Sequence, residues 1–355
     1  CPRIAEMTVP FIGGSESANT YMLYVFGAQE SVPALLRKVT YTGAAKALPE
    51  NAFRYLKGVT EVAYPDTVET IGNNAFRNTS IAEFSLGAGV KNIGEYAFAE
   101  TKLTGEIVVP ARIESLGAYA FAFNQSITKA AFEEGVKTIP EGAFYAYRSQ
   151  ASSNTYYYYS SLEEIVIPSS VESIGDGAFY YAGSNYTYDY AAGQKTDTVI
   201  LNFADGSKLK SIGASAFENC ENLKTLTFGS AQAPVLEGEY DDLAELYDAS
   251  SAYSYRNFVT VLAEAKGNLI AEVPANAVGY DTYVWKAYFA EVNKSDSVAV
   301  TKNTLYVIDL IRSVENPVTA EDKVAVALCR KLLDSLIPAQ RALVPEDAVK
   351  ILEQA

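Results

Sequence analysis

The amino-acid sequence predicts a repeat solenoid with a parallel sheet along one face, followed by a small all-α module at the carboxyl end. The first observation behind this prediction is a phrase that occurs seven times: an aliphatic residue, Gly or Pro, two variable residues, and then Ala-Phe. The first five copies begin 22 or 23 residues apart. Such a period is typical of units that bury their apolar faces only by stacking on copies of themselves. The pairs are Ala52-Phe53, Ala75-Phe76, Ala97-Phe98, Ala120-Phe121, Ala143-Phe144, Ala178-Phe179 and Ala216-Phe217.

Each repeat is expected to begin with a short strand that has one face inward, because apolar residues alternate over a few positions. These alternating sets are Ile81, Phe84 and Leu86; Leu162, Ile165 and Ile167; and Leu223, Leu226 and Phe228. A polar turn follows, and a second apolar pair, such as Val171 with Ile174, brings the chain back over the core before Gly or Pro interrupts regular structure. Ala is small enough for adjacent turns to approach. Phe at a constant phase should stack into a core spine, while strands of successive turns pair in parallel about 4.8 Å apart.

The stretch from Leu162 to Phe179, L-E-E-I-V-I-P-S-S-V-E-S-I-G-D-G-A-F, resembles the unit of the BspA-like leucine-rich repeat family, also described as Treponema-type repeats. That unit is approximately L-x-x-I-x-I-P-x-x-V-x-x-I-G-x-x-A-F. The resemblance covers about residues 35 to 230, and the segment from Val273 to Val278, with Trp285 after it, is similar to the family's closing unit. The resemblance implies a secreted or surface-anchored bacterial protein, often linked to adhesion, and implies no particular ligand.

Composition excludes several classes of function. The 355 residues include no His, so His-dependent triads, His general bases and most metal sites are unavailable. Cys1, Cys220 and Cys329 lie far apart without C-x-x-C spacing and are expected to be small buried or free thiols. The formal charge of −15 opposes phosphate backbones and anionic lipid surfaces. We therefore expect no enzyme activity, no cofactor and no nucleic-acid partner.

The sequence contains no apolar run near 18 residues, so we expect no membrane insertion within it. It has no starting Met and no signal-peptide pattern. We expect it to be a mature or excised piece of a longer product.

Two longer spacings interrupt the period, 35 residues after Phe144 and 38 after Phe179, and both fall between Ala-Phe and the next strand. Neighbouring turns should therefore project neighbouring loops. Eleven of the 26 Tyr lie in these loops among Ser, Asn, Gly and Ala. They are Tyr145, Tyr147, Tyr156, Tyr157, Tyr158, Tyr159, Tyr180, Tyr181, Tyr186, Tyr188 and Tyr190.

The composition of the two loops resembles that of antibody paratopes, where Tyr gives rigid contact area and Ser and Asn adapt. Tyr faces also suit stacking against sugar rings or apolar side chains. We therefore treat the eleven Tyr as candidate ligand-binding residues. The alternative is that the loops are tolerated insertions whose Tyr cover one another and the solenoid edge.

Two further segments have helical signals. The acidic stretch from Glu237 to Lys266 has approximate helical spacing, and we expect helix packed on the end of the solenoid. From about Thr301 the apolar period becomes 3.6, which predicts three short helices. The segments Val307–Ile311 and Ala339–Val344 resemble a small helical module of Gram-positive surface proteins, which implies a spacer or spare contact module.

The expected organisation is an N-terminal lead-in and cap over 1–47, the leucine-rich repeat solenoid over 48–233, a helical insertion with a terminal repeat or cap over 234–296, and a three-helix module over 297–355. We expect a non-enzymatic, cell-surface or secreted bacterial protein that contacts a host or bacterial surface protein, or a glycan, through the Tyr-rich loops and the adjoining sheet face. One alternative is a structural scaffold or spacer without a ligand. Another is carbohydrate capture for a neighbouring enzyme.

Overall fold

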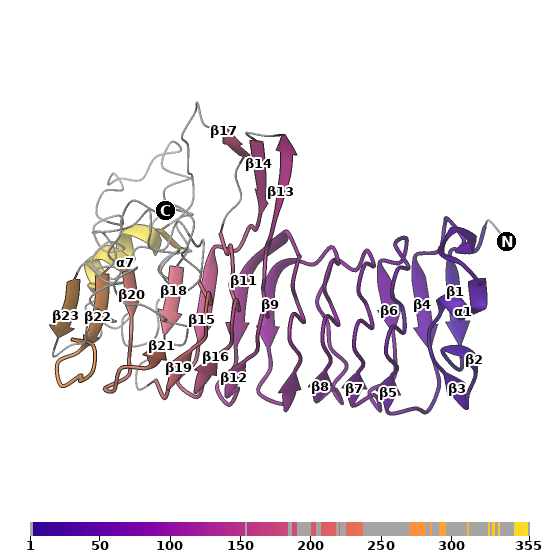
Figure 1. Cartoon of the computed structure of the whole chain (residues 1–355), viewed down its shortest axis with the longest axis horizontal. Helices are drawn as coiled ribbons and strands as arrows, with labels where there is room; N and C mark the ends of the chain where they lie inside the picture. The colour runs from indigo at the N-terminus through magenta and orange to yellow at the C-terminus, as the bar shows by residue number, and fades with distance from the viewer. Residues whose placement is uncertain are drawn as a thin grey trace.

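The structure is a computed structural model in which stacked turns form an elongated solenoid (Figure 1). It describes residues 3–152, 155–183, 187–189, 200–203, 207–217, 220, 225–236, 270–281, 285, 291–295, 311, 326, 329–330, 333 and 344–353. Most turns contribute a longer strand to one row and a two-residue strand to another, and both rows run along the solenoid.

The row of longer strands forms two parallel sheets. The first has the order β1-β4-β6 and the second the order β23-β22-β20-β18-β15-β11-β9. The strands of the first sheet are β1 (Glu6–Val9), β4 (Lys38–Tyr41) and β6 (Glu61–Ala63). Those of the second are β9 (Thr104–Val109), β11 (Ser126–Phe132), β15 (Glu164–Ile167), β18 (Ile200–Phe203), β20 (Thr225–Thr227), β22 (Ile270–Pro274) and β23 (Glu291–Ser295).

The row of two-residue strands follows the repeated phrase, since its strands from β5 to β19 end on the phrase's aliphatic residue and β21 continues the row. All pairs are parallel, and residues at the same position of successive repeats lie opposite each other, as Ile71 and Ile93 do. One sheet holds β5 (Ala47–Leu48), β7 (Thr70–Ile71), β8 (Asn92–Ile93) and β10 (Ser115–Leu116). The other holds β12 (Thr138–Ile139), β16 (Ser173–Ile174), β19 (Ser211–Ile212) and β21 (Val235–Leu236).

The strand expected over Ile81, Phe84 and Leu86 does not form. The inward and outward alternation is kept, because Phe84 and Leu86 pack against the core while the residues on either side of Phe84 are exposed. The ring of Phe84 lies edge-on to Phe98 and Phe121, with centroids 5.4 and 5.1 Å away. Burial is thus achieved without strand pairing, and the longer row is divided between β6 and β9 at this turn.

The predicted phenylalanine spine is confirmed. Centroids of successive rings lie 4.9–5.9 Å apart, and the rings are within 18° of parallel. The spine runs through Phe53, Phe76, Phe98, Phe121, Phe144, Phe179 and Phe217, each 5% exposed or less. Offset stacking of rings at this distance adds to the stabilisation that burial of each ring already provides.

Successive turns approach so closely at Gly117 that no side chain fits there. A Cβ added at Gly117 would lie 2.4 Å from the backbone nitrogen of Glu95 in the preceding turn. The sequence indicated only an interruption of regular structure here, whereas the structure shows backbone contact between turns. The Ala of each phrase is fully buried for the same reason.

The residue before each Ala adopts a left-handed conformation, with φ between 53° and 59° in all seven turns. These residues are Asn51, Asn74, Tyr96, Tyr119, Gly142, Gly177 and Ser215. Only Gly and, to a lesser degree, Asn adopt this conformation readily, so the two Tyr and the Ser are held there by the stacking of the turns.

The lead-in covers the first turn. Besides β1 it contains β2 (Gly13–Ser15), β3 (Ala18–Asn19), α1 (Leu23–Phe26) and the 3-10 helix η1 (Gln29–Ser31). Its residues Ile12 and Met22 are fully buried in the core, and the amide of Met22 donates to the carbonyl of Ala52 at 2.7 Å. At the other end, Trp285 packs edge-on against Phe228 with ring centroids 5.1 Å apart.

The carboxyl-terminal expectations are tested only in small part. The helix expected between Glu237 and Lys266 lies outside the described residues. Within 297–355 the structure describes α7 (Glu346–Glu353) and a few single positions, so the three-helix module stays a prediction. Cys220 and Cys329 are buried, and burial raises the pKa of the Cys329 thiol. No helix among the described residues is long and apolar enough to span a membrane.

The paired substitutions Gly142→Ala and Gly177→Ala test the packing of the left-handed turn. Both place Ala at a φ near 56° and should share a cost of about 1 kcal/mol in free energy of unfolding. The new Cβ at position 142 would also lie 2.2 Å from Cε1 of Tyr119, whereas the nearest atom at position 177 is 3.4 Å away. We expect Gly142→Ala to cost a further ~1–3 kcal/mol in denaturant titrations. In a Tyr119→Ala background the two substitutions should become equal, and a persistent difference would contradict this explanation.

Truncation of a central spine ring should be among the most damaging single changes. Phe98→Ala removes a buried ring that stacks on both sides, and we expect a loss of about 3–5 kcal/mol in free energy of unfolding. Phe84→Ala is the matched control, because that ring is only partly buried and should cost clearly less. Equal losses, measured by the same denaturant titration, would show that a spine ring contributes no more to stability than a ring packed beside the spine.

Candidate functional site

The two long insertions combine into one projecting sheet, called the fin here. It consists of β13 (Tyr147–Ser152), β14 (Thr155–Tyr159) and β17 (Thr187–Asp189), antiparallel in the order β13-β14-β17. The first two strands belong to the first insertion and β17 to the second, with Tyr156 opposite Tyr188. The fin stands above the row of longer strands (Figure 1). Neighbouring turns therefore do project neighbouring loops, and the two loops pair with each other.

Register distributes the predicted Tyr positions over both faces of the fin. Residues directly opposite each other share a face, and faces alternate along a strand. Tyr147 lies opposite Tyr159, so these two share a face with position 157. The other face has positions 156, 158 and 188, together with Arg148, which lies opposite Tyr158. Tyr186 and Tyr190 lie outside the described residues.

The remaining three predicted Tyr form the base of the fin. The rings of Tyr145 and Tyr180 are stacked with centroids 4.6 Å apart, and Tyr181 lies edge-on to Tyr180 at 4.7 Å. Tyr181 is only 7% exposed, so its ring serves packing. Tyr145 and Tyr180 are half-buried and keep part of their surface accessible.

A ladder of tyrosines connects this base with the earlier turns. Tyr96 and Tyr119 are stacked at 4.9 Å, and Tyr119 lies 5.8 Å from Tyr145. The Tyr119 hydroxyl donates to Oε1 of Glu141 at 2.7 Å, and burial together with this carboxylate raises the pKa of Tyr119. The phenol therefore stays neutral across the physiological range. The fin is thus attached to the solenoid by a continuous row of rings.

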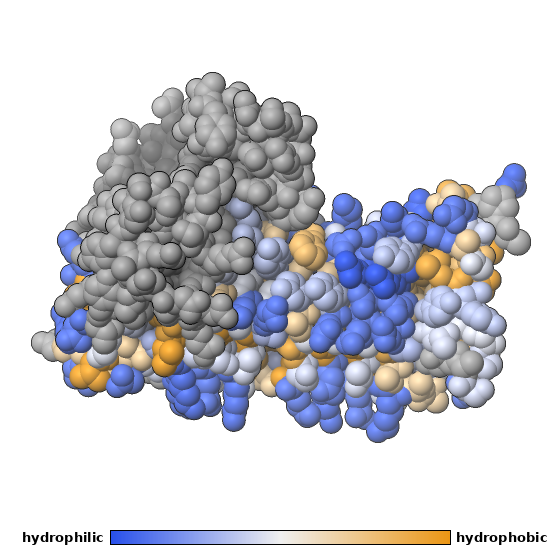
Figure 2. Space-filling view, viewed as in Figure 1, coloured by the Kyte–Doolittle hydropathy of each residue, from blue (hydrophilic) through white to orange (hydrophobic). Residues whose placement is uncertain are grey.

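A groove of about 720 Å³, lined mostly by polar and charged residues, crosses successive turns beside the base of the fin. The amide of Ser161, just after the fin, donates to the carbonyl of Gln125 at 3.0 Å, and the ring of Phe123 lies 5.7 Å from that of Tyr145. Both Gln125 and Phe123 line the groove. The whole lining is Lys57, Arg77, Asn78, Thr79, Ser80, Glu100, Thr101, Lys102, Leu103, Phe123, Gln125 and Ser126. Figure 2 shows hydrophilic residues gathered over the turns of β6 to β8.

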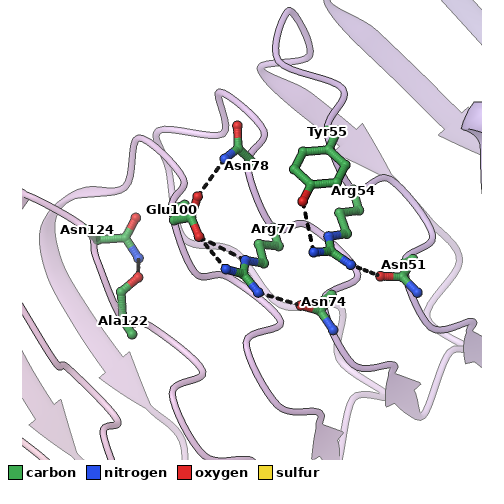
Figure 3. Close-up of polar contacts among 9 residues, drawn as sticks. All are labelled: Asn51, Arg54, Tyr55, Asn74, Arg77, Asn78, Glu100, Ala122 and Asn124. Atoms are coloured by element: carbon green, nitrogen blue, oxygen red, sulfur yellow. Dashed lines mark hydrogen bonds and ion pairs between the residues drawn. The ribbon is translucent and has the colours of Figure 1, made fainter. Parts of the chain in front are cut away.

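One wall of the groove is a hydrogen-bonded network between turns (Figure 3). Nε and Nη2 of Arg77 donate to Oε1 of Glu100 at 2.9 and 2.6 Å, and Nδ2 of Asn78 donates to Oε2 at 2.6 Å. Nη1 of Arg77 donates to Oδ1 of Asn74 at 3.2 Å, and its guanidinium lies 4.9 Å from the centroid of Tyr96. The Arg77 charge is therefore held in one position and largely neutralised by Glu100.

Beneath the groove, polar side chains are buried and satisfied by one another. Oγ1 of Thr101 donates to Oδ1 of Asn124 at 2.6 Å, and Nδ2 of Asn124 donates to the carbonyl of Phe98 at 2.8 Å. Thr79 donates to the carbonyl of Phe76 at 2.8 Å. Satisfied buried networks of this kind rigidify their surroundings.

Sequence reasoning singled out the Tyr loops and missed this groove. The signal that could have found it is the segment two to five residues after Phe76, Phe98 and Phe121, which is mostly polar and differs from turn to turn. A second signal is an Arg and a Glu one period apart, as with Arg77 and Glu100.

The adjoining sheet face carries charges that neutralise one another. Lys38 pairs with Glu61 at 2.5 Å, and Lys129 lies 3.2 Å from Glu106 and 3.4 Å from Glu164. Burial alone would lower the pKa of Lys129, but the two carboxylates outweigh it and hold that pKa above its ordinary value. Lys38 and Lys129 of this face are therefore neutralised by their neighbours. In the part of the chain that is described, no group of three His, Cys, Asp or Glu side chains is placed to hold a metal ion.

Solved structures similar to this chain are bacterial leucine-rich repeat proteins with low sequence identity. One from Bacteroides ovatus is 16% identical with a TM-score of 0.45, over 82% of this chain and 69% of that one. One from Eubacterium ventriosum is 16% identical with a TM-score of 0.36, over 81% and 78%. A leucine-rich cell surface protein from Faecalibacterium prausnitzii is 14% identical with a TM-score of 0.28, over 83% and 88%. No curated protein sequence matches the chain.

The repeats themselves match a family model. The model described as BspA type leucine rich repeat region matches in six copies, over residues 46–153, 149–187 and 193–234. These ranges account for more than half of the chain and include the phrases that form the spine. The protein belongs to the BspA type leucine-rich repeat family.

Proposed function

We propose that this protein is a non-enzymatic binding protein that acts outside the cell or at the cell surface, and that its fin contacts a host or bacterial surface protein or a glycan. The observation that carries the proposal is the pairing of the two insertions into one sheet, with Tyr156 opposite Tyr188. Insertions that only fill space have no need to pair with each other. Membership of the BspA type leucine-rich repeat family supports this location.

Physical chemistry favours a contact surface of this composition. Tyr has only two side-chain torsions and gives large amphipathic area, so little conformational entropy is lost when its ring is immobilised. The sheet fixes the backbone beneath the rings before any partner arrives, which lowers the entropic cost of binding. The ladder from Tyr96 to Tyr180 anchors the fin to the rigid solenoid.

A non-enzymatic role is supported by the residues that are available. The chain lacks His altogether, which removes the commonest general base and the nucleophilic triads that depend on it. The described Cys220 and Cys329 are buried and unsuited to nucleophilic attack on a bound substrate.

Two triple substitutions, one for each face of the fin, test the proposal. Tyr156→Ser/Tyr158→Ser/Tyr188→Ser changes one face, and Tyr147→Ser/Tyr157→Ser/Tyr159→Ser changes the other. Ligands would first be identified by applying the intact protein to arrays of glycans and purified extracellular-matrix proteins. We expect one triple variant to lose at least about tenfold in affinity for the identified ligand, because aromatic anchors dominate interface energies.

The two variants serve as controls for each other, since each removes three Tyr from the same small sheet. Unfolding temperatures close to that of the parent would show that the solenoid is intact. Unchanged affinity in both variants would refute the role of the fin. An absence of any ligand on both arrays would favour a scaffold instead.

A further inference from the structure

We infer that the groove beside the fin is a binding site for an acidic saccharide, a sugar chain that carries carboxylate or sulfate groups. The groove lies on the solenoid turns and not on the fin, and it is lined by residues between Lys57 and Ser126. Its volume of about 720 Å³ falls within the range of small-molecule sites, roughly 300–1,000 Å³.

The charge of the groove is opposite to that of the whole chain. Its lining contains three cations, Lys57, Arg77 and Lys102, and one carboxylate, Glu100. Arg77 and Glu100 neutralise each other at 2.6 Å, which leaves the two lysines. Both are exposed, and neither takes part in an ion pair among the described residues. The groove is therefore locally positive in a chain with a formal charge of −15.

The charge of the groove lining, and not the net charge of the chain, decides whether an anion binds here. At physiological ionic strength the screening length is about 8 Å, so carboxylates on distant turns contribute little inside the groove. The overall negative charge slows the approach of an anion without cancelling a contact with Lys57 or Lys102. Some exposed lysines outside the groove are already paired with a carboxylate, Lys46 with Glu69 and Lys210 with Glu172.

The rest of the lining suits a sugar better than an apolar ligand. Asn78 and Gln125 offer amides, and Ser80 and Ser126 offer hydroxyls, which match the hydroxyl groups of a saccharide. The amide of Asn78 is oriented by Glu100, and the buried Thr101 and Asn124 fix the turn beneath. The Asn78 amide is thus positioned before any ligand arrives, which lowers the cost of binding.

Phe123 supplies an apolar surface within this polar lining. It adopts φ 62°, as Asn78 and Glu100 do at the equivalent position with 61° and 55°. A bulky aromatic residue is rare in this conformation. The half-buried ring lies in the groove lining next to Tyr145, where its surface can stack against a sugar ring.

Calorimetric titration of the whole chain tests the inference with defined tetrasaccharides. Tetragalacturonate supplies carboxylates, a chondroitin sulfate tetrasaccharide supplies sulfate as well, and maltotetraose is the neutral control. We expect at least one acidic tetrasaccharide to bind, maltotetraose to bind much more weakly, and affinity to fall as salt is raised. Lys57→Gln/Lys102→Gln should weaken binding by at least about tenfold, which corresponds to the loss of two charge-assisted contacts.

Matched variants separate a site from diffuse attraction. Lys91→Gln removes an exposed lysine beside β8 that does not line the groove, and it should leave affinity nearly unchanged. Phe123→Asn removes the ring but keeps a residue that tolerates the left-handed conformation, and it should weaken binding without unfolding the turn. The two triple variants of the fin should bind the acidic tetrasaccharides like the parent, so failure of this inference is distinguishable from failure of the proposed function.

Three outcomes would overturn the inference. The first is that neither acidic tetrasaccharide binds. The second is that Lys91→Gln weakens binding as much as the double lysine variant does. The third is that a hexaglutamate peptide binds as tightly as the saccharides, which would identify an acidic peptide as the ligand class.

Discussion

The stacking of one phenylalanine ring on the next sets the geometry of the whole molecule. Rings 4.9–5.9 Å apart leave no space between turns, so the backbone of each turn must contact that of its neighbour. Gly117 is required by this contact, and the full burial of Ala120 has the same origin. The left-handed residue before each Ala lets the chain turn sharply enough to bring the next Phe into register. A single packing constraint thus acts on three positions of the repeat, although Pro49 and Pro140 replace the glycine in two of the seven phrases.

The same constraint determines where variation is tolerated. The segment that follows a spine Phe keeps its third residue buried, as at Leu56, Thr101 and Asn124, but its length and its exposed positions differ between turns. In the turns of Asn78 and Glu100 this segment is short and builds a groove. After Phe144 and Phe179 it expands into the fin. Both candidate surfaces are therefore variants of one position in the repeat, and this explains why they lie side by side.

Much of the fold could be predicted from the sequence, because repeats carry their core residues at a fixed phase. The spine, the parallel pairing and the adjacency of the two insertions all follow from spacing. The irregular segment at Phe84 could not, because alternation of apolar residues reports burial and not hydrogen bonding. The spatial role of the glycines was not predicted, since the 2.4 Å that would separate a Cβ at Gly117 from the Glu95 nitrogen is a property of three dimensions.

The candidate site was predictable only where composition was unusual. An excess of Tyr marked the insertions, but the strands they form depend on pairing between loops some thirty residues apart. The groove arises from contacts one period apart, such as that between Arg77 and Glu100, and no single repeat contains it. Its two lysines are ordinary residues in the sequence, and only the structure shows that Lys57 and Lys102, from different turns, line the same groove.

The direction of the inter-turn hydrogen bonds has a mechanical consequence. The strands lie across the long axis, with β1 and β23 at opposite ends (Figure 1), so the bonds between turns point along that axis. A force that pulls these two ends apart acts along the hydrogen bonds between turns. Such bonds break one turn at a time, whereas a force along the strands would load all the bonds of a pair of strands at once. Under flow or traction the solenoid would extend in steps of one repeat, and each lost turn would absorb work while the spine behind it stayed stacked.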